Sequence, residues 1–136
     1  HPHIAEVGRI GNTEHFRNMD RHEVTLHNNV VVVRVDESLY FANAEYIESY
    51  ILELCGKKPN MQHLVFMFSS VNFIDASAIE MFSSLIQKLK HRSICLHFSE
   101  VKGPVLDQIK NTDLLNILEP GRMFLSTDQA LRALSK

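Results

Sequence analysis

The chain has 136 residues, of which 45% are hydrophobic and 22% charged, and its formal net charge is −2. This length fits one domain that can bury about two-thirds of its unfolded surface without a disulfide or a metal. The near balance of charges excludes a basic nucleic-acid-binding protein as the first expectation, and the apolar content excludes a disordered acidic tail.

The cysteines and the apolar runs indicate the cellular setting. Cys55 and Cys95 lie in apolar stretches without a CxxC spacing, so we expect two reduced, buried thiols in a cytosolic protein. No signal peptide is recognisable, and the longest apolar runs, residues 30–33 and 64–68, are far shorter than the roughly 18–20 residues that a bilayer requires. We therefore expect that the chain does not span a membrane by itself. Its start at His1-Pro2-His3, without a methionine, predicts an excised part of a longer protein.

The N-terminal quarter of the chain predicts strands joined by turns. Residues 4–10 alternate weakly, as in a strand, and residues 11–13 are typical of a turn. Residues 24–27 form a possible short strand that would enter the next strand through a turn at 28–29. Residues 30–35, rich in valine, give the clearest strand and are too apolar for an edge that faces water.

A helix is predicted next, with Asn43 as its N-cap. Its apolar face has helical spacing, and Gly56 and Pro59 end it. That face consists of Ile47, Tyr50, Ile51 and Leu54.

The rest of the chain alternates between predicted strands and helices. The strands are residues 64–68, 94–98 and 123–125, and the helices begin near residues 75, 103, 112 and 126. Ser126-x-x-Gln129 forms a capping box at the start of the last helix. This alternation predicts an α/β fold with parallel strands joined by helical crossovers, and the preceding antiparallel hairpin makes the sheet mixed. We expect a single domain over residues 1–136, with 1–27 as connector and N-terminal strand or hairpin and 28–136 as the β/α core.

Two loops follow neighbouring predicted strands, residues 36–43 and residues 69–77. Ligands and partners of open α/β sheets gather at the carboxyl ends of the strands, so these loops are the candidate site. Ser77 fits a capping box with Glu80, or it is a phosphorylatable or anion-contacting hydroxyl at a helix N-terminus. Asp75 has the same two interpretations, a helix cap or a carboxylate of a docking surface.

Signals of catalysis and of metal binding are absent from the sequence. It contains no GxSxG, HExxH, P-loop or GxGxxG motif. Its eight histidines show no ligand spacing beyond His1-x-His3, and no Cys/His cluster has zinc spacing. We therefore expect no enzyme, no metal site and no cofactor.

Several motifs, in the same order along the chain, resemble the STAS domain of SulP-type anion transporters. Residues 36–44 resemble its LYFANA segment, and residues 71–78 resemble the signature in which Asp-x-Ser opens a helix. Residues 7–17 resemble the connector that leaves the membrane portion, and residues 100–105 and 124–131 also match.

The resemblance implies the STAS fold, a mixed four- to five-stranded sheet with parallel βαβ units and about four to five helices. It implies a non-catalytic, cytoplasmic C-terminal domain of a transporter of sulfate, bicarbonate or a dicarboxylate, on the inner face of the plasma membrane. The implied partners are the transporter's own membrane domain, cytosolic regulatory proteins and a nucleotide or small anion, with dimers in the full-length transporter and no nucleic acid.

The more distant resemblance is to anti-sigma-factor antagonists, in which a serine at this helix is phosphorylated. Asp75 and Ser77 match that motif, but Ala78 and Glu80 replace its two glycines, and a carboxylate one turn away would repel a phosphoserine. The alternative to the transporter domain is thus a free-standing phospho-switch with Ser77 as its phosphorylation site. In the first hypothesis, Tyr40, Asn43, Asp75 and Ser77 form a regulatory, partner-binding surface.

Overall fold

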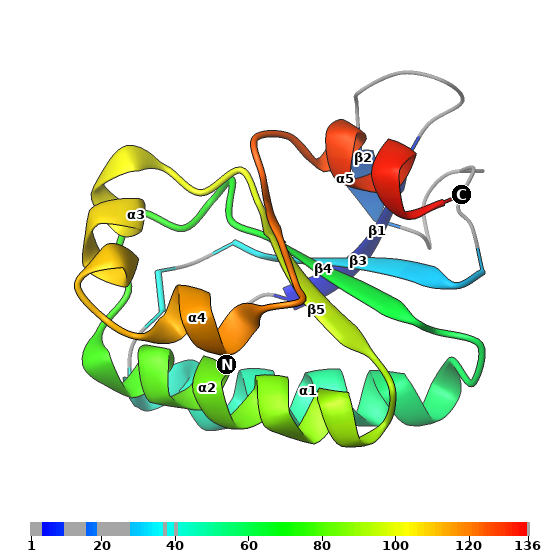
Figure 1. Ribbon diagram of the computed structural model, residues 1–136, viewed down its shortest axis with the longest axis horizontal. Coiled ribbons are helices and arrows are strands. Elements are labelled where there is room, and N and C mark those ends of the chain that lie inside the picture. The colour runs from blue at the N-terminus through cyan, green and yellow to red at the C-terminus, as the bar shows by residue number, and fades with distance from the viewer. Residues whose placement is uncertain (1–3, 10–15, 19–27, 37, 40, 136) are drawn as a thin grey trace.

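The computed structural model describes residues 4–9, 16–18, 28–36, 38–39 and 41–135. These segments form one mixed sheet flanked by helices (Figure 1). The strands are β1 (Ile4–Arg9), β2 (Phe16–Asn18), β3 (Val30–Val35), β4 (His63–Met67), β5 (Cys95–Ser99) and β6 (Met123–Phe124). The helices are α1 (Phe41–Lys57), α2 (Ala76–His91), α3 (Gly103–Lys110), α4 (Leu114–Leu118) and α5 (Thr127–Leu134).

The sheet has the strand order β2-β1-β3-β4-β5-β6. Strands β3 to β6 are parallel neighbours, whereas β1 pairs antiparallel with both β3 and β2. The predicted mixed α/β fold is confirmed. Among the described residues the sheet has six strands, one more than the upper expectation, because β2 is a three-residue strand in a polar segment without a strand pattern.

The predicted N-terminal elements are only partly described. The strand expected over residues 4–10 is β1, and Val7 is fully buried. The turn expected at 11–13 and the short strand expected at 24–27 lie outside the described residues. Within the described part, β3 pairs with β1 instead, in the register Val32 opposite Val7.

The two faces of the sheet carry different cores because successive strand residues point to opposite sides. Leu64 and Phe66 of β4 face the main core, which lies between the sheet and helices α1 and α2. These two helices lie side by side along one face of the sheet (Figure 1). Val65 and Met67 belong to a smaller core beneath α5, on the other face. The predicted apolar face of α1 is confirmed: Ile47, Ile51 and Leu54 are buried, and Tyr50 packs against the main core.

One of the helix caps predicted from the local sequence is present in the structure, and others are not. Ser126 caps α5, as predicted, and its Oγ accepts the Gln129 N–H at 3.1 Å. The prediction of Asn43 as a cap is wrong, because α1 already begins at Phe41 and the Asn43 amide donates to the Ser38 carbonyl at 3.0 Å. Ser77 is not a cap either. Asp75 takes that role by accepting the Ala78 N–H at 2.9 Å, so that Ser77 lies inside the first turn of α2.

Candidate functional site

The two loops predicted to converge do meet at the carboxyl end of the sheet. Leu39 forms an isolated parallel bridge with Ile74. The Leu39 N–H donates to the Phe73 carbonyl at 2.9 Å, and the Asp75 N–H donates to the Leu39 carbonyl at 3.0 Å. We call this region the carboxyl edge, defined by residues 38–39 and 69–77. Backbone hydrogen bonds therefore fix the position of one loop relative to the other.

Three of the four predicted site residues lie at or next to this edge. Asn43 is buried, at 8% exposure, and its bond to Ser38 ties the start of α1 to the first loop. Asp75 ends the second loop as the cap of α2, and half-buried Ser77 follows in the first turn. Tyr40 lies outside the described residues. The carboxyl edge thus brings together the backbone around Asn43, Asp75 and Ser77 at the starts of two helices.

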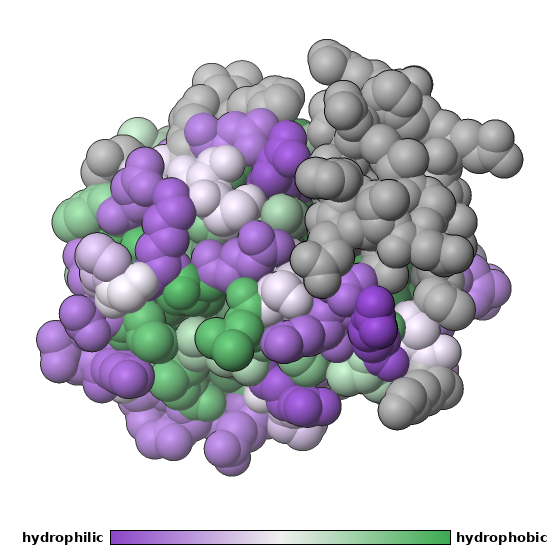
Figure 2. All heavy atoms as spheres, turned by 90° about the horizontal axis from the view of Figure 1, so that it is seen from above, coloured by the Kyte–Doolittle hydropathy of each residue, from purple (hydrophilic) through white to green (hydrophobic). Residues whose placement is uncertain are grey.

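The loop after β5 and helix α3 add residues that the sequence did not single out. The Lys102 ammonium donates to the Asn72 side chain at 2.7 Å, and the Gln108 side chain accepts the Ile74 N–H at 3.2 Å. Phe73 is 41% exposed between these contacts. Figure 2, which views the molecule from above, shows an apolar patch among hydrophilic residues, and the picture does not tie it to any one loop. The Lys102–Asn72 and Gln108–Ile74 contacts join residues 30 or more positions apart, so they could be predicted only from knowledge of the strand order.

A buried polar network attaches the start of α5 to the end of β5. Ser99 and Thr127 are both fully buried, and their hydroxyls lie 2.8 Å apart. The Glu100 carboxylate accepts hydrogen bonds from both the backbone and the hydroxyl of Thr127. Glu100 has a φ of 58°, in the left-handed region that non-glycine residues rarely adopt. The buried hydroxyls of this network are hydrogen-bonded, so the network holds the start of α5 against the end of β5.

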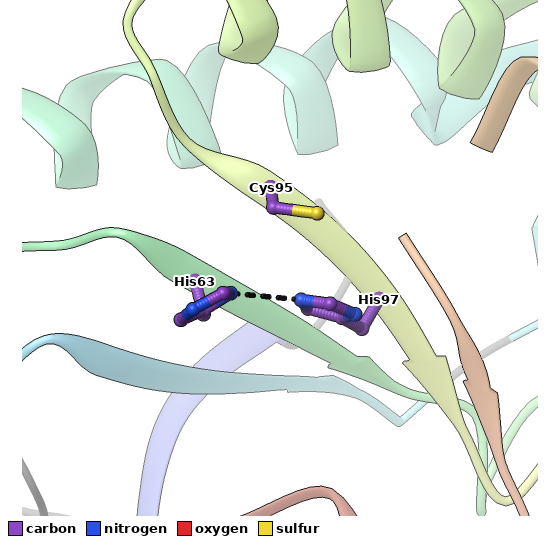
Figure 3. Close-up of side chains that lie close together, drawn as sticks. All are labelled: His63, Cys95 and His97. Atoms are coloured by element: carbon purple, nitrogen blue, oxygen red, sulfur yellow. Dashed lines mark hydrogen bonds between the residues drawn. The ribbon is translucent and has the colours of Figure 1, made fainter. Parts of the chain in front are cut away.

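A second cluster of chemically active side chains lies on the α5 side of the sheet, near the amino ends of β4 and β5. His63, Cys95 and His97 each offer a potential ligand atom, and these atoms all lie within 4.8 Å of one another (Figure 3). The register explains the proximity, since His63 is opposite Cys95 and His97 follows two residues later on the same face. Linear spacing gave no sign of this cluster, because its members come from two strands that only the register of the sheet brings together.

Backbone contacts determine which nitrogen of His97 carries the proton. The Arg122 N–H donates to Nδ1 of His97 at 3.0 Å, so this nitrogen must hold a lone pair. In the neutral ring the proton is then on Nε2, which lies 2.9 Å from Nδ1 of His63 and donates to it. The result is a directed chain of hydrogen bonds from Arg122 through His97 to His63. Because the Nδ1 lone pair of His63 accepts this bond, it is not available as a base for the Cys95 thiol.

Burial and nearby charge shift the pKa values of this cluster. Burial, together with smaller effects of His63 and the Arg122 guanidinium, lowers the pKa of His97 to about 4. Burial also lowers the pKa of His63. Burial raises the pKa of the Cys95 thiol, and the charge of Lys90 partly offsets this rise. Burial likewise raises the pKa of the Cys55 thiol, and Arg92 partly offsets it. Both imidazoles are therefore neutral at physiological pH.

Acid should destabilise the protein through His97. The unfolded chain takes up a proton near pH 6.5, but the folded ring does so only near pH 4, so stability falls as the pH drops through that window. Between about pH 7.5 and 5 we expect His97 to account for a loss of about 2 kcal/mol in the free energy of unfolding. Urea titrations in buffer with a chelator measure this.

The matched control for the acid effect is His97→Gln, which removes the titrating ring but keeps hydrogen-bonding groups. Carboxylate groups change the stability of the parent and of the variant with pH in the same way, so the difference between the two pH profiles isolates the contribution of His97. Parallel profiles for the two proteins would contradict the prediction.

The fold and the comparisons with known proteins agree on the class. An antiparallel N-terminal strand followed by four parallel strands with helical crossovers defines a mixed α/β domain. A family model for the STAS domain matches residues 21–130. The chain therefore belongs to the STAS domain family.

Curated relatives resemble the chain in sequence, and solved structures share its fold. The chain is 31% identical over 142 residues to the probable sulfate transporter 4.2 of Arabidopsis thaliana, and the match covers 96% of this chain and 21% of that protein. The murine Slc26a9 anion transporter superimposes with a TM-score of 0.82 at 18% identity, over 100% of this chain and 23% of that one. The SulP transporter STAS domain from Vibrio cholerae gives 0.67 at 21% identity, over 84% and 87% of the two chains. The chain thus spans about a fifth of the length of the curated relatives it matches.

Within the described segments, no helix combines the length and hydrophobicity needed to cross a bilayer.

Proposed function

We propose that this chain is the regulatory STAS domain of a SulP-type anion transporter and acts at the cytoplasmic face of the membrane. The observation that carries the proposal is the match to a sulfate transporter along 96% of this chain but only 21% of that protein. Transport itself would then belong to the remainder of the full-length protein. The role of this domain would be non-catalytic: contacts with the membrane domain, a second copy or a cytosolic protein modulate transport or trafficking.

We place the regulatory contact at the carboxyl edge, around Tyr40, Asn43, Asp75 and Ser77. Three features support this placement. The two loops are held together by backbone bonds, which gives a partner a defined surface. The N-terminus of α2 carries a partial positive charge, and beyond the capping Asp75 its first turn holds no acidic residue, so an acidic group or small anion of the partner is still attracted. Phe73, 41% exposed, adds apolar contact area.

The competing hypothesis is a free-standing phospho-switch in which Ser77 is phosphorylated. The half-buried Ser77 hydroxyl in the first turn of α2 is compatible with it. The reading frame of the complete protein distinguishes the two: a transporter domain requires upstream apolar segments of about 20 residues each. A start codon directly before His1 would favour the phospho-switch and contradict the transporter.

The contact itself is tested by Ser77→Glu in the full-length protein. A carboxylate at this position would repel an acidic partner group. It should leave the stability of the domain nearly unchanged, because its attraction to the N-terminus of the helix is offset by repulsion from Asp75 and Glu80. We expect uptake of labelled sulfate, or its regulation, to fall at least several-fold at matched expression. Denaturation of the isolated domain checks folding.

Ser84→Glu is the matched control for this variant, because it is the same change at an exposed position two turns later on α2. If both variants behave like the parent, the carboxyl edge has only a structural role. If both lose activity equally, the added charge and not the site is responsible.

A further inference from the structure

We propose that Cys95 and His63 bind a soft monovalent metal ion, Cu(I), between the Cys95 sulfur and Nδ1 of His63, with His97 as a positioning residue. This site is independent of the carboxyl edge, because it lies at the amino ends of β4 and β5. Parallel pairing places His63 directly opposite Cys95. Thiolate sulfur with imidazole nitrogen is a donor pair that soft metals select.

The distances suit a two-coordinate ion. A metal bound to one sulfur and one imidazole nitrogen in a line needs about 4 Å between the two ligand atoms. The ligand atoms of the cluster lie within 4.8 Å of one another, so small side-chain rotations suffice. Figure 3 shows all three side chains on the same side of the two neighbouring strands.

His97 is excluded as a ligand by its hydrogen bonds. Its Nδ1 accepts the Arg122 N–H at 3.0 Å, which leaves the proton on Nε2 and no free lone pair. A metal ligand histidine normally donates its second N–H to an acceptor, and here a donor faces that nitrogen instead. Once the metal occupies the His63 lone pair, the Nε2–H loses its acceptor, and we assign that role to the nearby Cys95 thiolate. His97 then orients the sulfur without coordinating the ion.

Charge favours a monovalent over a divalent ion. Among the described residues, the cluster contains no carboxylate, and both Arg122 and Lys90 are close enough to act on its titrating groups. With a neutral His63 and a Cys95 thiolate, Cu(I) gives a neutral site, whereas Zn²⁺ would leave a net positive charge beside two cations. On binding, the sulfur–metal bond replaces the S–H bond and the thiol proton goes to solvent.

The ion can reach the thiol from the surface. Cys95 and His63 are half-buried, whereas His97 is only 2% exposed. A pocket of about 210 Å³ opens beside Cys95, lined by Lys90, Ser93, Ile94, Leu96, Leu118 and Pro120. This pocket includes neither His63 nor His97 and is lined in part by side chains of the main core, so the path of the ion to the sulfur rests on the partial exposure of Cys95 and His63.

The test is anaerobic competition of the reduced chain against a chromophoric Cu(I) chelator. We expect one equivalent of Cu(I) to move to the protein. Cys95→Ser should abolish this transfer, and His63→Gln should weaken the affinity at least tenfold. Cys55→Ser, which removes the other thiol, should bind like the parent. His1 and His3 are kept in every variant, so any binding by them is a common background.

Silver(I), which does not change oxidation state, reports the ligands directly by NMR of the 15N-histidine-labelled chain. We expect silver–nitrogen coupling at His63 Nδ1, while the His97 Nε2 keeps its proton and its Nδ1 shift is retained. Silver coupling to a His97 nitrogen overturns the two-ligand assignment. Failure to withdraw Cu(I), equal binding by Cys95→Ser, or stoichiometric retention of Zn²⁺ against a chelator of matched strength overturns the site itself.

Discussion

Replacing Phe66 with alanine is expected to lower the free energy of unfolding by about 3–5 kcal/mol. Phe66 is fully buried in β4, at the centre of the sheet, and its ring centroid lies 5.0 Å from those of both Phe68 and Phe82. Phe98 completes the aromatic cluster, 5.2 Å from Phe82. Removal of the ring therefore leaves a cavity among side chains held by a sheet and a helix, which can collapse only in part.

Urea unfolding of the isolated domain measures this effect. Ile86→Ala, on α2 at 1% exposure, should cost roughly 2–5 kcal/mol for the same reason. Leu125→Ala is the control, because Leu125 is 87% exposed and its truncation should change stability by less than about 0.5 kcal/mol. Equal unfolding midpoints for Phe66→Ala and Leu125→Ala would show that the main core is assigned wrongly.

Gly121→Ala should destabilise the domain by about 3 kcal/mol or more, although it adds a single methyl group. A Cβ at this position would lie 1.8 Å from the Leu96 carbonyl oxygen and 2.7 Å from that of Leu118. Both obstacles are backbone atoms, so neither can rotate away as a side chain would. β5 and the segment after α4 must separate to admit the methyl group, which disturbs the approach to β6.

Gly56→Ala provides the matched comparison, since the same methyl group meets no atom within 4 Å there. Gly56 lies in the last turn of α1, where alanine should raise stability by up to about 0.5–1 kcal/mol. Thermal unfolding of both variants gives shifts of opposite sign if the close approach at Gly121 is responsible. A neutral Gly121→Ala variant would refute that explanation.

Features that depend on neighbours in the sequence were predictable. The β-branched run of β3 forms a buried strand, and the spacing of Ile47, Ile51 and Leu54 gives the buried face of α1. Ser126 caps α5 because its partner, the Gln129 N–H, is only three residues away. Strand–helix alternation was sufficient to place the two loops at one edge, since parallel strands end on the same side.

Local patterns failed where several residues could fill one role. Asp75 and Ser77 both suit a cap, and the chain selects Asp75, whose extended backbone and bond to Ala78 start α2 two residues earlier. Asn43 lost its predicted role for a similar reason, because α1 begins before it and its amide is drawn to the Ser38 carbonyl. Such choices depend on how each helix docks on the sheet, which no short window of sequence contains.

By itself the sequence determined the α/β class, the main helices and parallel strands, the capped start of α5 and the resemblance to STAS domains. Tertiary structure alone decided which side chains meet across strands. His63 and His97 are 34 positions apart, yet parallel pairing of β4 with β5 places their nitrogens 2.9 Å from each other. The physical reason is that hydrophobic periodicity specifies which face of a strand is buried, whereas the register between strands depends on the packing of the whole sheet.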